Sequence, residues 1–170
     1  MLKPYSVALL LGLAGGVAFN AAAVPELSTV GEGSYRYLFW QLYDARLATQ
    51  SGEFESYSQS TPLLLELTYK RDISKQQFID ATVDEWQKLG HSSKEQQQQW
   101  AEQLQSLWQD VKEGDTLAAL LLADGRVTFY LNAVETGALE DTAFGPAFFD
   151  IWLHPDTSAP KLRRQLIAAQ

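Results

Sequence analysis

Strand patterns and helix patterns occupy separate runs of this sequence, and their segregation limits the fold more than any other feature. Apolar stretches predict strands, which are expected at residues 34–48, 63–69, 116–122, 127–132 and around 136–139. Apolar residues at helical spacing predict helices at residues 75–89, 93–111, 142–153 and 158–168. Such segregation is typical of α+β proteins. We therefore expect an antiparallel sheet with a layer of helices on one face.

Local signals at the ends of these segments support the assignments. Ser74 is a good helix N-cap, and Gly90 stands where a helix C-cap favours glycine. Asp124-Gly125, between two apolar stretches, is a strong hairpin signal. Pro160 suits the first turn of the last helix. No repeat or flexible linker interrupts residues 24–170, so we expect one domain there.

The segment at residues 34–48, SYRYLFWQLYDARLA, is the most unusual predicted strand, because both of its faces would be largely apolar. We expect it to be covered on both sides, with Arg36 and Arg46 aimed at the same face. A guanidinium there needs an acid or an anionic ligand, since an unpaired buried charge is costly. Asp44 and Glu66 are candidate partners within the protein. Alternatively, an arginine at the mouth of an apolar cleft would hold a ligand carboxylate.

Residues 1–23 have the pattern of a secretory signal peptide. Lys3 gives a short positive start, residues 7–19 are apolar, and Ala21 and Ala23 offer a cleavage site of the A-x-A type. The apolar run is shorter than the roughly 20 residues that span a bilayer. An uncleaved membrane anchor is the alternative. Cleavage predicts a periplasmic or secreted protein with no membrane span, in a compartment where ATP and NAD are scarce.

Composition excludes several kinds of site and partner. The chain has no cysteine, which excludes disulfides, thiolate zinc sites and cysteine nucleophiles. Its formal net charge of −8 argues against nucleic acid and anionic membrane surfaces as partners. The hydrophobic share of 46% is ordinary for a globular protein and names no activity. The oligomeric state is left open.

The sequence carries no recognisable pattern for catalysis, a metal or a cofactor. His91 lies in the predicted turn between two helices and His154 follows a helix, so we interpret both as solvated surface residues. Gly31 and Gly33 form a G-x-G, but no third glycine or βαβ unit follows. The acidic residues at positions 110–115 lack the spacing of a calcium loop. We predict no catalytic residue, no metal and no cofactor.

Four segments agree in order and spacing with one known family: VGEGSYRYLFWQLYDARL; LELTYKRDIS, which enters a helix ending in WQKLG; GRVTFYLNAVETGALED; and FGPAFFDIWLHPDTSAPKLRRQLI. Together they resemble the secreted bacterial branch of the chalcone isomerase-like superfamily, over essentially all of residues 29–167. The resemblance implies an open-faced β-sandwich, in which a large antiparallel sheet carries a layer of helices. It also implies a ligand cleft between the sheet and the helices.

The resemblance implies two activities, the cyclisation of chalcones to flavanones and non-catalytic fatty-acid binding. Catalytic members carry a tyrosine at the start of the first long helix, an asparagine further along it, and a threonine or serine in the penultimate helix. Ser74, Ala81 and Ile151 stand near those three places. The polar network for a phenolate substrate is therefore missing, and flavanone formation is not expected.

For fatty-acid binding, the resemblance implies an arginine and a tyrosine as ligand-binding residues. Arg36 or Arg46 would be the arginine, and Tyr69 is the tyrosine nearest to the helix entry. Tyr43 and Trp86 are candidates for the cleft wall. The alternative for each aromatic residue is an ordinary core position with its polar atom satisfied.

These observations favour an exported, non-catalytic protein that binds a small amphipathic carboxylate, such as a fatty acid, in a cleft between sheet and helices. Whether the protein is an enzyme stays open. One alternative is an intramolecular isomerase or lyase acting on a substrate other than a chalcone. The other is an interaction module of the cell envelope with a fully packed core.

Overall fold

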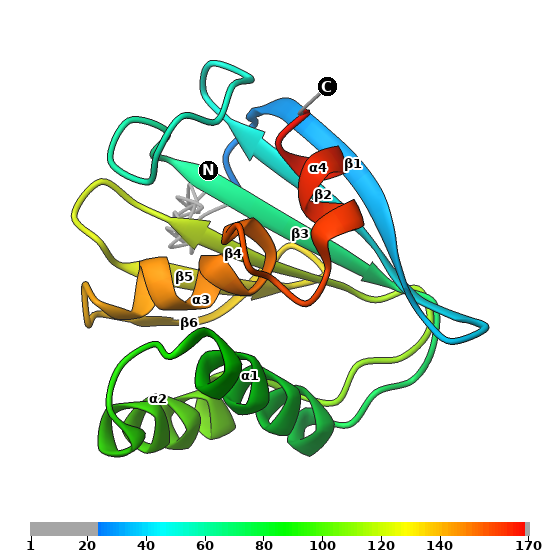
Figure 1. The fold of residues 1–170 in the computed structure, drawn as a ribbon, viewed down its shortest axis with the longest axis vertical. Coiled ribbons are helices and arrows are strands. Elements are labelled where there is room, and N and C mark those ends of the chain that lie inside the picture. Colours follow the sequence, from blue (N-terminus) through cyan, green and yellow to red (C-terminus); the bar gives the residue numbers. More distant parts are fainter. Residues whose placement is uncertain (1–23, 169–170) are drawn as a thin grey trace, which may run out of the picture.

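A computed structural model describes residues 24–168 as a six-stranded antiparallel sheet with four helices (Figure 1). Its elements follow the chain as β1 (Ser28–Tyr37), β2 (Trp40–Thr49), β3 (Leu63–Tyr69), α1 (Lys75–Leu89), α2 (Lys94–Leu107), β4 (Thr116–Leu121), β5 (Val127–Leu131), β6 (Val134–Leu139), α3 (Phe144–Leu153) and α4 (Pro160–Leu166). Each strand pairs with its neighbour in sequence, so the sheet is an open meander. The α+β class and the antiparallel sheet are confirmed. The expected signal peptide lies outside the described residues.

The predicted single strand at residues 34–48 is wrong, because the chain folds back on itself at Leu38-Phe39. Strand β1 lies before this turn and β2 after it, with Tyr37 opposite Trp40. The turn carries no glycine, asparagine, aspartate or proline, so the sequence gives no sign of it. Coverage on both sides is also wrong, since the residues around the turn are exposed.

The two faces of the sheet differ in what covers them. Alternate residues of the strands, such as Leu47, Leu65 and Phe129, join buried residues of all four helices in the main core. We call this side the helix face. Figure 1 shows α3 and α4 crossing the sheet, with α1 beside α3. The outer face carries a smaller cluster that includes Leu64 and Tyr130.

Helices α1 and α2 form an insertion between the paired strands β3 and β4. Ser74 and Gln77 form a capping box at the start of α1, and Gly90 ends the helix with a left-handed φ of 68°. Helix α2 ends at Leu107, earlier than predicted. Beyond it, Val111 and Ile73 exchange two backbone hydrogen bonds of 3.0 Å. This bridge closes the base of the insertion.

Helix α4 lies against β1 at Gly31 and Gly33. A Cβ at Gly31 would lie 2.1 Å from the backbone oxygen of Gln165, well inside van der Waals contact. A Cβ at Gly33 would lie 2.4 Å from the Gln165 side chain and 2.8 Å from Leu162. The two glycines of the G-x-G therefore allow a close approach of helix and strand, a packing role.

Candidate ligand cavity

A cavity of about 580 Å³ lies between the sheet and helices α1 and α3. Strands β1, β2 and β3 line one side of it, and the two helices line the other. Its apolar lining includes Leu67, Phe78, Phe148, Ile151 and Trp152. Open space next to a packed core gives an apolar ligand somewhere to be buried. Its volume lies within the range typical of small-molecule sites.

Tyrosines from the strands form much of the sheet side of this cavity. Tyr35 and Tyr43 stack with ring centroids 5.2 Å apart, and Tyr69 meets Tyr43 edge to face at 5.6 Å. The indole N–H of Trp152 donates to the Tyr43 hydroxyl across 3.0 Å. Burial raises the pKa of Tyr43 and of Tyr69 well above the ordinary value. Both phenols are therefore neutral at physiological pH and are unsuited to act as bases.

Charged groups line the cavity near its opening. Lys88 Nζ lies 2.7 Å from Glu85 Oε1, and this hydrogen bond raises the pKa of Lys88. The second oxygen of Glu85 is buried and has no hydrogen-bond partner among residues 24–168. Arg71 stands over the ring of Trp40, with Cζ 4.1 Å from the ring centroid. No carboxylate of the described chain forms an ion pair with Arg71, so this cation is free to meet an anion.

The comparisons with known proteins decide the family. The family model described as chalcone isomerase-like matches residues 27–168. The chain belongs to the chalcone isomerase-like family. A bacterial relative from Haemophilus influenzae, an uncharacterized protein, is 27% identical over 149 residues, which are 88% of this chain and 72% of the relative. The fold is similar to the crystal structure of a fatty-acid binding protein of Arabidopsis thaliana, with a TM-score of 0.63. That match has 10% identity and covers 88% of this chain and 90% of the plant protein.

The three positions that the resemblance placed near the catalytic residues of the family, Ser74, Ala81 and Ile151, form no polar network in this chalcone isomerase-like protein. Ala81 and Ile151 both line the cavity with apolar side chains. The Ser74 hydroxyl caps helix α1, where it accepts from the Gln77 backbone N–H. None of the three residues brings a polar group into the cavity.

The structure brings together only part of the predicted ligand-binding set. Tyr43 and Tyr69 line the cavity. Trp86 is fully buried and donates its indole N–H to the Ala147 carbonyl across 3.0 Å, as in the core alternative. Neither Arg36 nor Arg46 lines the cavity.

Both arginines lie on the outer face of the sheet. Arg46 forms an ion pair of 2.6 Å with Glu66, the partner that the sequence offered. Arg36 contacts Gln41 at 3.5 Å. Their neighbours along the strands face the helices, and alternation sends the arginines to the opposite side. Arg71, which sequence reasoning missed, continues the alternation of Leu67 and Tyr69 just beyond the end of β3.

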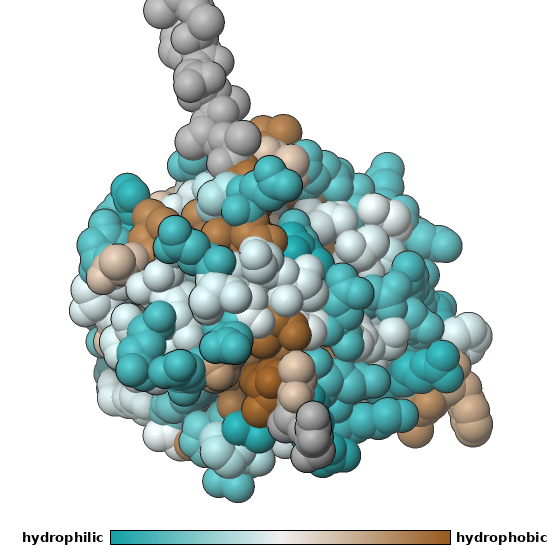
Figure 2. All heavy atoms as spheres, turned by 90° about the horizontal axis from the view of Figure 1, so that it is seen from above, coloured by the Kyte–Doolittle hydropathy of each residue, from teal (hydrophilic) through white to brown (hydrophobic). Residues whose placement is uncertain are grey.

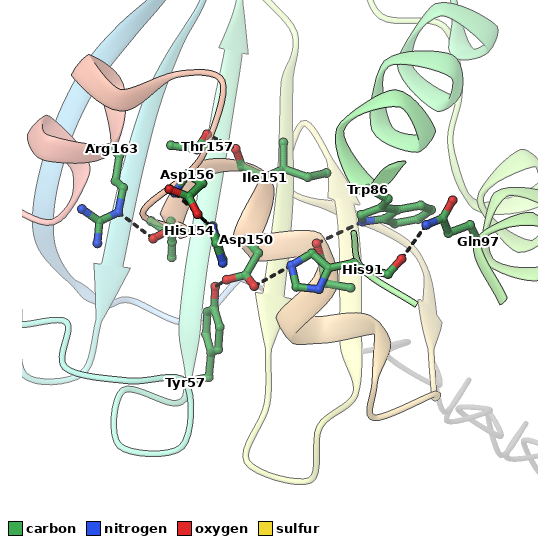
Figure 3. A network of polar contacts seen from close by, with 12 residues as sticks. Tyr57, Trp86, His91, Gln97, Asp150, Ile151, His154, Asp156, Thr157 and Arg163 are labelled. Carbon is green, nitrogen blue, oxygen red and sulfur yellow. Dashed lines mark hydrogen bonds and ion pairs between the residues drawn. The ribbon is translucent and has the colours of Figure 1, made fainter. Parts of the chain in front are cut away.

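A second polar cluster lies away from the cavity, on the loop between β2 and β3, on α3 and on the turn between α1 and α2 (Figure 3). The Tyr57 hydroxyl donates a hydrogen bond to Asp150 across 2.5 Å. His91 Nε2 lies 2.8 Å from the other Asp150 oxygen, but the angle between the two groups is not that of a hydrogen bond. The rings of His91 and His154 meet edge to face at 5.9 Å. Both histidines, which we interpreted as solvated surface residues, are half-buried, with side-chain exposures of 26% for His91 and 31% for His154. The cluster fixes the position of α3, which lines the cavity at Ile151.

Within residues 24–168, no group of histidines and acids is arranged to hold a metal ion. None of the helices described is long and apolar enough to cross a bilayer.

Proposed function

We propose that this chalcone isomerase-like protein binds a small amphipathic carboxylate, such as a fatty acid, without transforming it. The observation that carries the proposal is a largely apolar cavity with a cation at its opening that has no acidic partner among the described residues. Such a site matches a ligand with an apolar chain and one negative charge.

Arg71 is the group best placed to hold the carboxylate. The Trp40 ring supports the guanidinium from one face, which leaves its N–H edge available for a bidentate contact. Lys88 is less suitable, because Glu85 already neutralises it. The chain of the ligand would lie between the sheet tyrosines and the apolar side chains of α1 and α3, where Phe78 and Phe148 are.

Fold similarity supports this assignment. The Arabidopsis protein with the same fold is named as a fatty-acid binding protein. Ala81 and Ile151 line the cavity with apolar side chains at the places where the family resemblance expects catalytic polar groups, which favours binding over cyclisation. The cavity also counts against an envelope module with a fully packed core.

We further propose that the protein is exported to the periplasm or secreted. The support is the pattern of residues 1–23, a positive start and an apolar stretch before small residues. N-terminal sequencing of protein from a periplasmic fraction would test this. A first residue after Ala23 is the expected result, whereas an intact Met1 in the cytoplasm would contradict export.

The binding proposal is tested by titrating the mature protein with palmitate, by displacement of a fluorescent fatty acid and by native mass spectrometry. We expect Arg71→Gln to weaken binding about ten- to a hundredfold, the value of a charged hydrogen bond. Arg36→Gln is the matched control, since Arg36 is an exposed cation on the outer face. No uptake by the wild type contradicts the proposal. Loss in Arg36→Gln or Arg46→Gln, with Arg71→Gln unchanged, would restore the sequence-based choice of arginine.

One observation favours a second candidate, an isomerase acting on a substrate other than a chalcone. The free oxygen of Glu85 lines the cavity and is an acceptor for a substrate proton. A panel of enones and flavonoids should then show turnover that Glu85→Gln abolishes. Turnover unaffected by Glu85→Gln, or no turnover at all, would remove this candidate.

A further inference from the structure

The turn between β1 and β2 exposes an uninterrupted apolar segment. Tyr37, Leu38, Phe39 and Trp40 have 61%, 76%, 95% and 58% of their surface exposed. We call these four residues the hairpin tip. Among the described residues, the one other large hydrophobic side chain exposed to this degree is Val134, at 64%. The tip projects beyond the body of the protein in Figure 1, and Figure 2 shows its brown and tan spheres standing out at the side.

Folding does not explain the residues at the apex. Leu38 has a φ of 54°, a conformation that a hairpin turn normally gives to glycine or asparagine. Phe39, almost fully exposed, packs against nothing that would compensate. An apolar residue that is both conformationally unfavourable and solvated points to a role outside the folded monomer.

We propose that the hairpin tip inserts into the interfacial region of a lipid bilayer. Leu38 and Phe39 stand at the apex, where they would enter the acyl chains. Tyr37 and Trp40 flank them, and amphipathic rings of this kind favour the level of the lipid headgroups. The order along the hairpin, polar-tipped aromatics around an apolar apex, therefore matches the polarity gradient of a bilayer surface.

The charges next to the hairpin tip indicate whether the bilayer is zwitterionic or anionic. Lys70 and Arg71 lie beside Trp40, together with Asp72 and Glu113, so the two signs balance there. Lys70 is also paired with Asp44 at 2.8 Å. With a formal net charge of −8 on the whole chain, anionic lipid offers no attraction. Insertion is driven by apolar burial, and a zwitterionic bilayer is the expected partner.

The position of the tip adds a second argument. Tyr37 and Trp40 also line the opening of the cavity, so a bilayer docked on the tip would lie against that opening. A protein partner would need a pocket for a convex, uncharged hairpin, whereas a bilayer accommodates it without a matching shape. The inference goes beyond the proposed function and does not depend on which ligand the cavity holds.

Tryptophan fluorescence provides a direct test, because Trp40 is the exposed tryptophan and Trp86, Trp100, Trp108 and Trp152 are at most 8% exposed. We expect phosphatidylcholine vesicles to shift the emission to shorter wavelength, and lipids brominated on the acyl chains to quench it. Trp40→Phe should remove both signals while vesicle co-sedimentation persists. No shift and no quenching in the wild type would overturn the proposal.

Variants then locate the contact. Leu38→Asp and Phe39→Asp should each weaken co-sedimentation with phosphatidylcholine vesicles about tenfold or more. Aspartate tolerates a positive φ, so Leu38→Asp should fold normally. Val134→Asp is the matched control and should bind like the wild type. An equal loss in Val134→Asp, or binding that needs anionic lipid and disappears in high salt, would overturn the assignment to the tip.

Discussion

Replacing Gly31 by alanine should displace helix α4, whereas the same change at Gly33 should cost less. The added methyl at Gly31 would meet backbone atoms, the oxygens of Gln165 and Leu166, at 2.1 and 2.6 Å. Backbone cannot give way without moving α4 or β1. At Gly33 the obstacles are the side chains of Gln165 and Leu162, and the end of a glutamine side chain can rotate.

The loss in unfolding free energy can be worked out from the packing that α4 loses when it moves. Overpacking in a core costs about 1–3 kcal/mol. Undocking α4 exposes Leu162 and Leu166, now 2% and 0% exposed, at about 1.5–3 kcal/mol each. Gly→Ala also gains about 0.4–1 kcal/mol by restricting the unfolded chain. Full undocking would cost several kcal/mol, whereas a shift of α4 costs the overpacking and only part of the leucine burial. For such a shift we expect a net loss of about 3 kcal/mol for Gly31→Ala and about 1 kcal/mol for Gly33→Ala.

Urea unfolding followed by circular dichroism measures both losses. With an m-value of about 2 kcal/mol/M, the midpoint should fall by about 1.5 M for Gly31→Ala and about 0.5 M for Gly33→Ala. Adding Gln165→Ala should recover part of the loss at Gly33 and none at Gly31. Equal midpoints for the two single variants, or a smaller loss at Gly31, would refute the reasoning.

Three further predictions concern the polar cluster around Asp150, the stability of the protein at low pH, and the cavity. Tyr57→Phe should lower the unfolding free energy by about 2 kcal/mol, because Asp150 loses a charged hydrogen bond; unchanged urea midpoints would contradict this. The hydrogen bond from Lys70 lowers the pKa of Asp44 below its ordinary 3.8, so its stabilisation is complete above that value and is lost as the pH falls. Asp44→Asn, at a half-exposed site, should therefore cost about 0.5 kcal/mol at pH 7 and nothing near pH 2, and a constant difference would exclude the linkage. Ala81→Trp should fill the cavity and reduce palmitate binding without lowering the midpoint; full binding would place the ligand elsewhere.

Most elements were predictable because their signals are local. Ser74 and Gly90 bound the first helix, and Asp124-Gly125 marks the β4–β5 turn, as capping and turn chemistry require. The β1–β2 turn was not predictable, since Leu38 takes a conformation for which leucine has no preference. Its neighbour Phe39 gives no turn signal either.

The site was harder to predict than the fold. Tyr43 and Tyr69 reach the cavity, as predicted from the sequence. Arg71 was missed, although strand alternation continued past Tyr69 would have placed it on the same face. The sequence favoured Arg36 and Arg46 instead, because both lie in the aromatic segment at residues 34–48. Their position on the outer face follows from which side the helices cover, and only the three-dimensional arrangement determines that.

The bridge between Ile73 and Val111 has a consequence for how this protein changes over evolutionary time. It makes the two-helix insertion a cassette whose ends are fixed at one point, while β3 and β4 pair without it. Lengthening a loop inside the cassette raises the entropic cost of closing that loop only slowly. Because α1 forms a wall of the cavity, new ligand preferences can arise inside the cassette while the sheet keeps its register.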